Sequence, residues 1–287
     1  MFAKKYQLRI CLLFIVSMLV LITISTQNDV QGSTLEKQQI EEKVTLVANN
    51  SWPNIHQNVV TDFNANVSSP FMEESAFIHP FAIVIGNCYI GEKVFVAPTA
   101  VCRGDEGTPI HIGPFSNLQD GVVLHGLETT FNGKNIDERR FSITGERLLG
   151  NDSRFDNGYS VFVGQNSSLA HGVLIHGPAY VGNNTFVGME SMVFDAKLGN
   201  NVAVGVASTI TGAVEVADNK FVPPGSVITT QEQADALPER IGTDYENINS
   251  AVIHVNEKFA EGYGKLGISE RESLMEEEML ETSRSSP

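Results

Sequence analysis

The most regular feature of the chain is an apolar residue at every sixth position. The series cover 78–102, 112–124, 163–193 and, after a slip of one residue, 198–228, and a glycine often follows the apolar residue. A period of six matches neither the helical period of 3.6 residues nor the two-residue alternation of an ordinary sheet. It is the signature of a parallel β-helix built from hexapeptides, each forming one short strand and one turn. We therefore predict that these residues point inward and stack along a prism-shaped core.

The segments around the repeats predict the remaining organisation. We expect the β-helix domain to span 70–230, with a polar loop insert at 130–160. Long inserts in compact repeats often carry function. After the repeats, the sequence TTQEQADALPER predicts a short helix and the apolar spacing of 249–266 predicts an amphipathic helix along the prism, so we assign 231–266 to C-terminal helices. The acidic residues 267–287 predict a solvated tail.

The N-terminus carries a targeting pattern. Three basic residues within the first nine precede an apolar run over 10–24, which is the order of a secretory signal. We interpret 1–32 as a signal peptide, and the slightly long run keeps an uncleaved membrane anchor as the alternative. Residues 33–69 are expected to form an N-terminal extension. Both interpretations predict an exported, extracytoplasmic protein, membrane-anchored in the second case.

Composition and charge limit the function. The 287 residues carry a formal net charge of −15 and show no basic stripe, so we expect no nucleic-acid partner. Only Cys88 and Cys102 follow the N-terminal segment, so no disulfide framework is expected. About 200 residues remain for one domain, which is enough to bury a sizeable core.

Two histidines share one phase of the repeat. His125 follows inward Leu124 and His176 follows inward Ile175, and removing the insert leaves 18 residues between them, one coil of three hexapeptides. They should therefore stack on neighbouring coils and face outward. His171 falls on another face, so it should meet such a pair only across an interface with a second copy. Three imidazoles with one open position are the arrangement of a catalytic zinc site, and three separate surface histidines are the alternative.

Segments around these histidines resemble the gamma-class carbonic anhydrases. The matching sequences are RGDEGTPIHIGPFSNLQDGVVLHGLET (103–129), SLAHGVLIHGPAYVGNNTFVGM (168–189) and AVIHVNEKFAEGY (251–263). With the repeats, the resemblance covers about 70–265. It implies a mainly β fold, a left-handed parallel β-helix with a C-terminal α-helix packed along it, that assembles as a homotrimer.

The resemblance also implies a metal site. His125 and His176 correspond to the two metal ligands of one subunit, and His171 corresponds to the ligand that a neighbouring subunit supplies. Zinc is the expected cofactor, with iron or cobalt as alternatives because imidazole suits all three.

Charged residues near this site receive roles from the same resemblance. Arg103 and Asp105 correspond to an ion pair at the subunit interface, with the arginine near bound bicarbonate. Glu106 corresponds to the acid in proton transfer close to the metal, and Glu128 corresponds to a surface proton shuttle. A purely structural salt bridge and an ordinary loop carboxylate are the alternatives for Arg103–Asp105 and Glu128.

Three carboxamides complete the implied site. Gln119 corresponds to the residue that orients the metal-bound hydroxide, and Asn117 corresponds to its supporting neighbour, with a turn cap as the alternative. Asn256 corresponds to the carboxamide near the substrate. His254 stands where the resemblance leads us to expect tyrosine. We interpret it as a residue of the helix surface, and a position near the metal that alters rate or pH dependence is the alternative.

The expected function is the reversible hydration of carbon dioxide to bicarbonate and a proton, by a metal-bound hydroxide at a trimer interface. A dication held by neutral imidazoles can lower the pKa of water from 15.7 to about 7. A catalytically silent trimeric scaffold of the same family is the first alternative, and loss of a ligand or of the proton shuttle would support it. A hexapeptide acyltransferase is the second alternative, but it does not explain three placed histidines.

Overall fold

The computed structural model describes residues 54–284, except for 129, 132–133 and 136–139. The predicted signal peptide or anchor therefore lies outside the described residues, as does most of the predicted N-terminal extension. Within the described ranges, no helix is long and apolar enough to cross a membrane.

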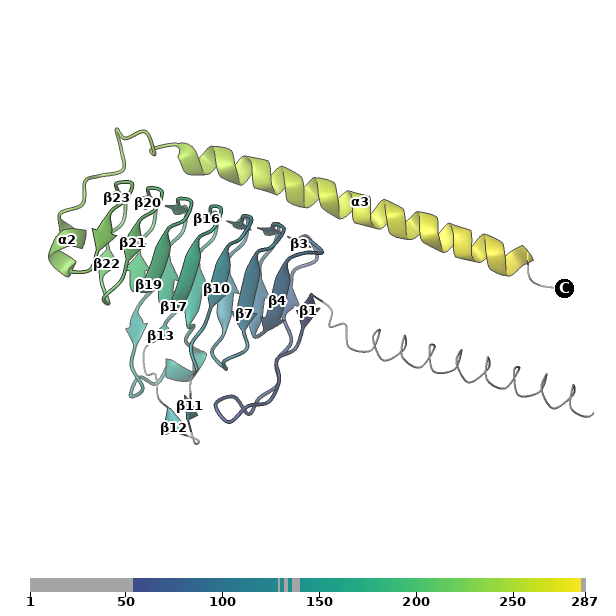
Figure 1. Cartoon of the computed structure of the whole chain (residues 1–287), viewed down its shortest axis with the longest axis horizontal. Helices are drawn as coiled ribbons and strands as arrows, with labels where there is room; N and C mark the ends of the chain where they lie inside the picture. The colour runs from purple at the N-terminus through teal and green to yellow at the C-terminus, as the bar shows by residue number, and fades with distance from the viewer. Residues whose placement is uncertain (1–53, 129, 132–133, 136–139, 285–287) are drawn as a thin grey trace, which may run out of the picture. The chain divides into compact units, whose positions relative to one another are not determined.

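Short parallel strands wind into two sheets (Figure 1). The 13-stranded sheet contains β1 (Ile55–His56), β4 (Ile83–Gly86), β7 (Val101–Gly104), β10 (Val123–His125), β17 (Leu174–Val181), β15 (Val161–Val163), β8 (Ile110–Ile112), β5 (Cys88–Ile90), β2 (Phe71–Met72), β19 (Met192–Leu198), β21 (Thr209–Ile210), β22 (Glu215–Val216) and β24 (Val227–Ile228). It covers two faces of the prism, because β17 pairs with β10 through its first residues and with β15 through its last.

The third face is a seven-stranded sheet. It contains β23 (Phe221–Val222), β20 (Ala203–Val204), β18 (Phe186–Val187), β16 (Ser168–Leu169), β9 (Asn117–Leu118), β6 (Phe95–Val96) and β3 (Phe77–Ile78). All of these neighbouring strands run parallel. The arrangement is the parallel β-helix that the period of six predicts, and it fits the left-handed form that the family resemblance implies.

The predicted inward residues form the core. Every one of them from Val84 to Val222 is at most 1% exposed, whereas Ile78 in the first coil is only partly buried. The stacking follows the repeat, since Leu118 pairs with Leu169, which pairs with Val187. Each fully buried aliphatic side chain contributes about 1.5–3 kcal/mol relative to exposure, so the stack supplies much of the stabilisation of the fold.

Small polar side chains form hydrogen bonds between successive coils. The Ser116 hydroxyl donates to the Gly164 carbonyl at 2.8 Å, and the Thr185 hydroxyl donates to the Gly199 carbonyl at 2.9 Å. Glycine is required where coils approach most closely: a Cβ atom on Gly182 would lie 2.5 Å from the carbonyl of Gly199. The recurring glycine after the inward residue therefore has a steric cause.

The C-terminal region is helical, as predicted. The short helix α2 (Gln231–Asp235) begins at Thr230 with a capping box formed with Gln233. The long helix α3 (Ile248–Arg284) contacts β3, β6 and β16. It continues beyond residue 266, where the sequence analysis ended it. Residues 268–284 contain no glycine or proline and are rich in Glu, Leu, Met and Arg, which favour a helix.

The insert is less loop-like than predicted. It contains the hairpin strands β11 (Thr130–Phe131), β12 (Lys134–Asn135), β13 (Arg140–Phe141) and β14 (Arg147–Leu148) and the 3₁₀ helix η1 (Phe155–Asn157). Phe141 is fully buried against Phe162 and Tyr180 of the β-helix. Arg147 Nη1 lies 2.9 Å from Asp195 Oδ1. The insert is therefore docked on the prism by an apolar cluster and an ion pair.

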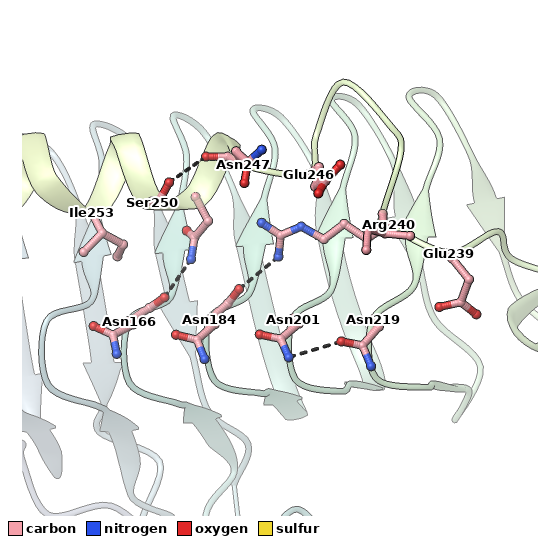
Figure 2. A pocket seen from close by; sticks show the side chains of 12 residues that line it. Asn166, Asn184, Asn201, Asn219, Glu239, Arg240, Glu246, Asn247, Ser250 and Ile253 are labelled. Atoms are coloured by element: carbon pink, nitrogen blue, oxygen red, sulfur yellow. Dashed lines mark hydrogen bonds between the residues drawn. The ribbon is translucent and has the colours of Figure 1, made fainter.

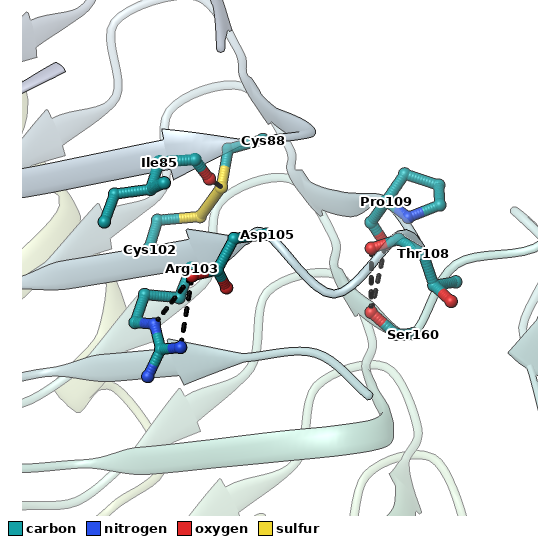
Figure 3. The surroundings of a disulfide bond; sticks show 8 residues. All are labelled: Ile85, Cys88, Cys102, Arg103, Asp105, Thr108, Pro109 and Ser160. Atoms are coloured by element: carbon teal, nitrogen blue, oxygen red, sulfur yellow. Dashed lines mark hydrogen bonds and ion pairs between the residues drawn. A yellow bond between two sulfur atoms is a disulfide. The ribbon is translucent and has the colours of Figure 1, made fainter. Parts of the chain in front are cut away.

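A disulfide joins Cys88 and Cys102, with their Cα atoms 6.7 Å apart (Figure 3). The sequence analysis expected no disulfide framework, and it placed Cys102 only as an inward residue of the stack. Cys102 does point inward and is fully buried. A single bridge between two buried core positions was missed because two cysteines set no recognisable spacing pattern.

His111 provides a test of the fold's pH dependence. Its ring stacks between Tyr89 and Phe162, with centroid distances of 4.8 and 4.5 Å. Burial lowers the pKa of His111, and its hydrogen bonding to backbone only partly opposes this. The unfolded chain therefore takes up a proton near the ordinary pKa of about 6.5 while the folded chain stays neutral. Stability is thus lost as the pH falls below that value.

We predict that His111→Phe, which keeps a stacked ring without a titratable group, reduces the loss of thermal stability between pH 7 and pH 5. The expected difference in Tm loss is on the order of 2–4 °C, measured by circular dichroism at both pH values. His254→Phe, at an exposed position on α3, is the matched control. Equal pH slopes for the wild type and His111→Phe would show that this residue does not link protonation to folding.

Candidate active site

One column of side chains crosses the outer face of neighbouring strands. In β7, β10, β17 and β19, Arg103 is in register with His125, His125 with His176, and His176 with Phe194. The two histidines therefore lie on adjacent coils, as their phase in the repeat predicts. The register is set by the inward neighbours Leu124 and Ile175, which stack in the core.

The two imidazoles face each other closely. His125 Nδ1 lies 3.2 Å from His176 Nε2, and the ring planes meet at 83°. His176 Nδ1 lies 3.0 Å from the carbonyl oxygen of Gly177. A proton on that nitrogen is donated to the carbonyl, which leaves the Nε2 lone pair of His176 directed away from the backbone.

His125 is held close to a carboxylate. Its Nε2 lies 3.1 Å from Glu106 Oε1, within ion-pair distance. Nε2 is a buried atom without a hydrogen-bond partner among the described residues, so this contact is not a hydrogen bond. Burial lowers the pKa of His125, and Glu106 only partly opposes it. The lowered pKa favours the neutral imidazole, which is the form that binds a metal.

Arg103 and Asp105 form an ion pair next to this column (Figure 3). Arg103 donates to Asp105 Oδ2 from Nε at 3.2 Å and from Nη2 at 3.1 Å. The other carboxylate oxygen, Oδ1, is buried and has no hydrogen-bond partner within the described part of the chain. The guanidinium itself is partly exposed, so it can still meet an anion.

A second group of predicted residues lies on a different face. Gln119, His171 and Asn256 line a cavity of about 340 Å³ between the seven-stranded sheet and α3. Its other walls include Phe95, Ala97, Val252 and Phe259. His171 is exposed, and its Nδ1 lies 3.1 Å from Asp120 Oδ2. Because Nδ1 faces the carboxylate, Nε2 is the nitrogen left for another ligand.

Hydrogen bonds orient the carboxamides. Buried Asn117 donates to the Ser168 hydroxyl at 2.9 Å and accepts from Gln119 Nε2 at 3.3 Å. This places Asn117 in contact with Gln119 rather than at a cap. Asn256 is 7% exposed and donates to the Val252 carbonyl within α3. Each of these two cavity-lining carboxamides has its amide nitrogen engaged, and its side-chain oxygen accepts no hydrogen bond from the residues that the structure describes.

Glu128 and His254 lie at the periphery. Glu128 is exposed, and its backbone forms an isolated bridge with Gly107, the residue after Glu106. The two glutamates are therefore neighbours on adjoining backbone segments. His254 is exposed on α3 and does not line the cavity of Asn256.

The predicted site residues of a single chain lie on two different faces of the prism. His125 and His176 lie with Arg103, Asp105 and Glu106 on the 13-stranded sheet, and His171 lies with the carboxamides beside α3. Over the described residues of a single chain, no three His, Cys, Asp or Glu side chains are close enough to hold a metal. Each face therefore carries half of the predicted set.

Two residues at these half-sites were missed by the sequence analysis. Asp120 contacts His171, and the Phe194 ring meets that of His176 edge-on at 5.1 Å. Asp120 directly follows Gln119, so the sequence shows that it lies near the predicted site. The sequence does not show that its side chain contacts His171. Phe194 follows inward Val193 just as His176 follows Ile175, so the repeat itself could have placed it in the column.

Comparisons with known proteins place the chain in a family. A scan of family models finds no match. The chain is 40% identical over 230 residues to a carbonic anhydrase of Methanosarcina thermophila, covering 79% of this chain and 87% of that protein. It is 42% identical over 203 residues to the carboxysome assembly protein CcmM of a Nostoc species, covering 71% of this chain but only 33% of that one.

Solved structures agree on the fold. A candidate acetyltransferase of Bacillus cereus superimposes with a TM-score of 0.53 at 16% identity, covering 74% of this chain and 99% of that one. This likeness shows the hexapeptide β-helix fold alone. Within that fold class, the identity to the Methanosarcina protein is decisive. The chain belongs to the gamma-class carbonic anhydrases, which are enzymes. Membership in this family implies a metal cofactor.

Proposed function

We propose that this protein catalyses the reversible hydration of carbon dioxide to bicarbonate and a proton, at a site shared between two subunits of a homotrimer. The division of the site carries the proposal: His125 and His176 face outward on one side of the prism, and His171 lies on another side with Gln119 and Asn256. A neighbouring copy that presents its His171 face to the His125 face would bring all three imidazoles together.

The residues present fit a divalent metal. His125 Nε2 is buried without a hydrogen-bond partner among the described residues, and its pKa is lowered by burial. Gly177 and Asp120 engage the Nδ1 atoms of His176 and His171, as second partners of metal-bound histidines commonly do. His125, His176 and the partner subunit's His171 would hold the ion, with zinc proposed and iron or cobalt as alternatives. When bound, the metal supplies the Lewis acidity that lowers the pKa of water.

The chain's own residues would position the reactants. The side-chain oxygens of Gln119 and Asn256 can accept a hydrogen bond from the attacking water, and amide hydrogens can donate to the oxygen on which charge develops. Phe95, Ala97 and Val252 give the cavity apolar walls suited to carbon dioxide. Arg103 keeps part of its surface exposed beside the histidine column, where it can attract the bicarbonate anion.

Two glutamates offer a route for the proton. The proposal is supported by the position of Glu106 beside His125 and by the backbone bridge between Gly107 and Glu128, an exposed residue. A proton accepted near the histidines can pass to the surface through these groups.

The alternatives have less support. All three histidines, both glutamates and the carboxamides are present, so nothing in the sequence favours a silent scaffold. The acyltransferase alternative rests on fold likeness at 16% identity.

We also propose that the protein is exported. The support is the basic and then apolar N-terminal sequence, with cleavage and membrane anchoring as the two outcomes. Fractionation of the native cells with N-terminal sequencing decides between them. Recovery of the intact chain in the cytoplasm would overturn export.

The shared site predicts complementation between inactive subunits. His171→Ala and His125→Ala should each abolish carbon dioxide hydration alone. In a randomly mixed trimer, a site is intact when its pair comes from the first variant and its third histidine from the second. Equal mixing should therefore restore about a quarter of the wild-type activity, measured by stopped-flow hydration after refolding the two variants together.

The control is a mixture of His125→Ala with His176→Ala, two variants that lack residues of the same half-site. No combination of these subunits rebuilds an intact site, so this mixture should stay inactive. Absence of rescue in the first mixture, after mass spectrometry has verified subunit exchange, would contradict the shared site.

Glu128→Ala tests the proton route. Proton export contributes to kcat but not to kcat/KM. The variant should therefore lower kcat by about 100-fold at low buffer concentration and change kcat/KM little. Imidazole buffer should restore part of the loss. Glu74→Ala, another exposed carboxylate in the first coil, should behave like the wild type. An unchanged kcat for Glu128→Ala would exclude this residue from the route.

A further inference from the structure

A second cavity lies beside the start of α3 and belongs to neither half-site. Its volume is about 690 Å³, which is within the range of small-molecule sites. Turns of the β-helix form one wall, and the segment that connects α2 to α3 forms the other (Figure 2). It shares no lining residue with the cavity of His171. The inference drawn from it goes beyond the proposed function.

Four asparagines line this cavity on successive coils. Asn166, Asn184, Asn201 and Asn219 occupy the same turn and have φ angles of 54°, 55°, 56° and 63°. Asparagine tolerates this left-handed conformation well. The conformation alone does not demand it, since Thr99, Glu190 and Ala207 adopt φ angles of 63°, 58° and 54° at another corner. The ladder of amides is therefore a chemical feature of this corner.

The oxygen of a buried amide in the cavity wall has no hydrogen-bond partner among the described residues. Asn249 is 5% exposed and donates from Nδ2 to the Asn166 carbonyl at 2.8 Å. Its Oδ1 is buried and accepts no hydrogen bond from any described residue. An unsatisfied buried acceptor is destabilising, and Asn249 is one of the residues that line the cavity, so a shift of its side chain would let a donor in the cavity satisfy this oxygen.

A buried guanidinium in the cavity wall has a donor without an acceptor. Arg240 is 9% exposed, and it donates to the carbonyls of Tyr245 and Asn184, each at 3.2 Å. Its Nη2 finds no protein acceptor in the part of the chain that the structure describes. Burial lowers the pKa of Arg240, which reflects this loss of solvent.

The charges around the cavity do not favour an ion. Glu239 pairs with Lys220 at 2.6 Å, and Glu246 accepts from the Gly242 amide at 2.9 Å and lines the cavity with Arg240. One arginine beside two carboxylates is a poor anion site, and two carboxylates with basic neighbours offer few ligands for a cation. Most of the remaining lining groups are neutral amides.

We propose that this cavity binds a neutral oligosaccharide. A hydroxyl group both donates and accepts, so it can satisfy Asn249 Oδ1 and Arg240 Nη2. It can also pair with the amides of the ladder, in which Asn201 donates to Asn219 at 3.2 Å and each of these two amides keeps further hydrogen-bonding capacity (Figure 2). The coils repeat at about 4.8 Å, close to the length of one sugar ring, so successive rings of a linear chain can meet successive asparagines. The aliphatic side chain of Ile253 supplies an apolar contact for a ring face.

Cellotriose and maltotriose titrated into the full-length protein test this proposal, with binding followed by saturation-transfer NMR and calorimetry. At least one of them should bind the wild type. Asn249→Leu should weaken that binding at least tenfold by removing the buried acceptor. Asn184→Gly keeps the left-handed turn while removing one amide of the ladder, and it should weaken binding several-fold even if Asn249→Leu is unstable. Thr99→Gly, at a left-handed turn outside the cavity, should leave binding unchanged.

The proposal is overturned if neither trisaccharide binds the wild type, or if both cavity variants bind as the wild type does. Binding of inorganic phosphate in place of the sugars, lost with Arg240→Met, would also overturn it and would mark an anion site. Carbon dioxide hydration by Asn184→Gly should equal that of the wild type, so failure of this proposal can be told apart from failure of the proposed function.

Discussion

The stacking of inward aliphatic side chains from coil to coil is the interaction on which the rest of the molecule depends. Leu124 on Ile175 and Leu118 on Leu169 set the register of the strands. A shift of one residue would turn every inward side chain outward. Because the register is fixed in the core, the residues that follow the inward positions fall into columns on the surface. His125 and His176 are 51 residues apart in the sequence, yet their ring atoms approach to 3.2 Å for this reason.

The same geometry prevents one prism from completing the predicted site. Side chains on two faces diverge around a solid core, so His171 cannot join the column of His125 whatever its rotamer. A neighbouring copy would therefore have to bring its His171 face to the column of His125. This links assembly to catalysis in the proposed function: a single copy has two half-sites, with the metal ligands on one and the third ligand with the carboxamides on the other.

Much of this arrangement could be predicted from the sequence, and the reasons are specific. The period of six placed the core, the stacked histidines and the face of His171, because it reports backbone geometry directly. It could not predict that Asp120 contacts His171, since that contact depends on the conformation of one turn. The disulfide between Cys88 and Cys102 was missed because the inward position of Cys102 already had an explanation as an apolar residue. The sequence predicts a polar loop for the insert, because Phe141 belongs to no periodic pattern and only the fold brings Phe162 and Tyr180 against it.

Helix α3 shows how an addition to a regular repeat creates irregular chemistry. The seven-stranded sheet exposes Phe77 and Phe95 on its outer face, and Ala260 and Tyr263 of the helix cover them. Lys93 pairs with Glu257 and Glu261 and fixes the helix at the same place. Held in this way, the helix closes one cavity with Asn256 and borders another with Asn249 and Ile253. The repeat alone forms flat faces and corners. The packed helix adds one cavity over a face and another beside a corner, and the two cavities have different lining residues.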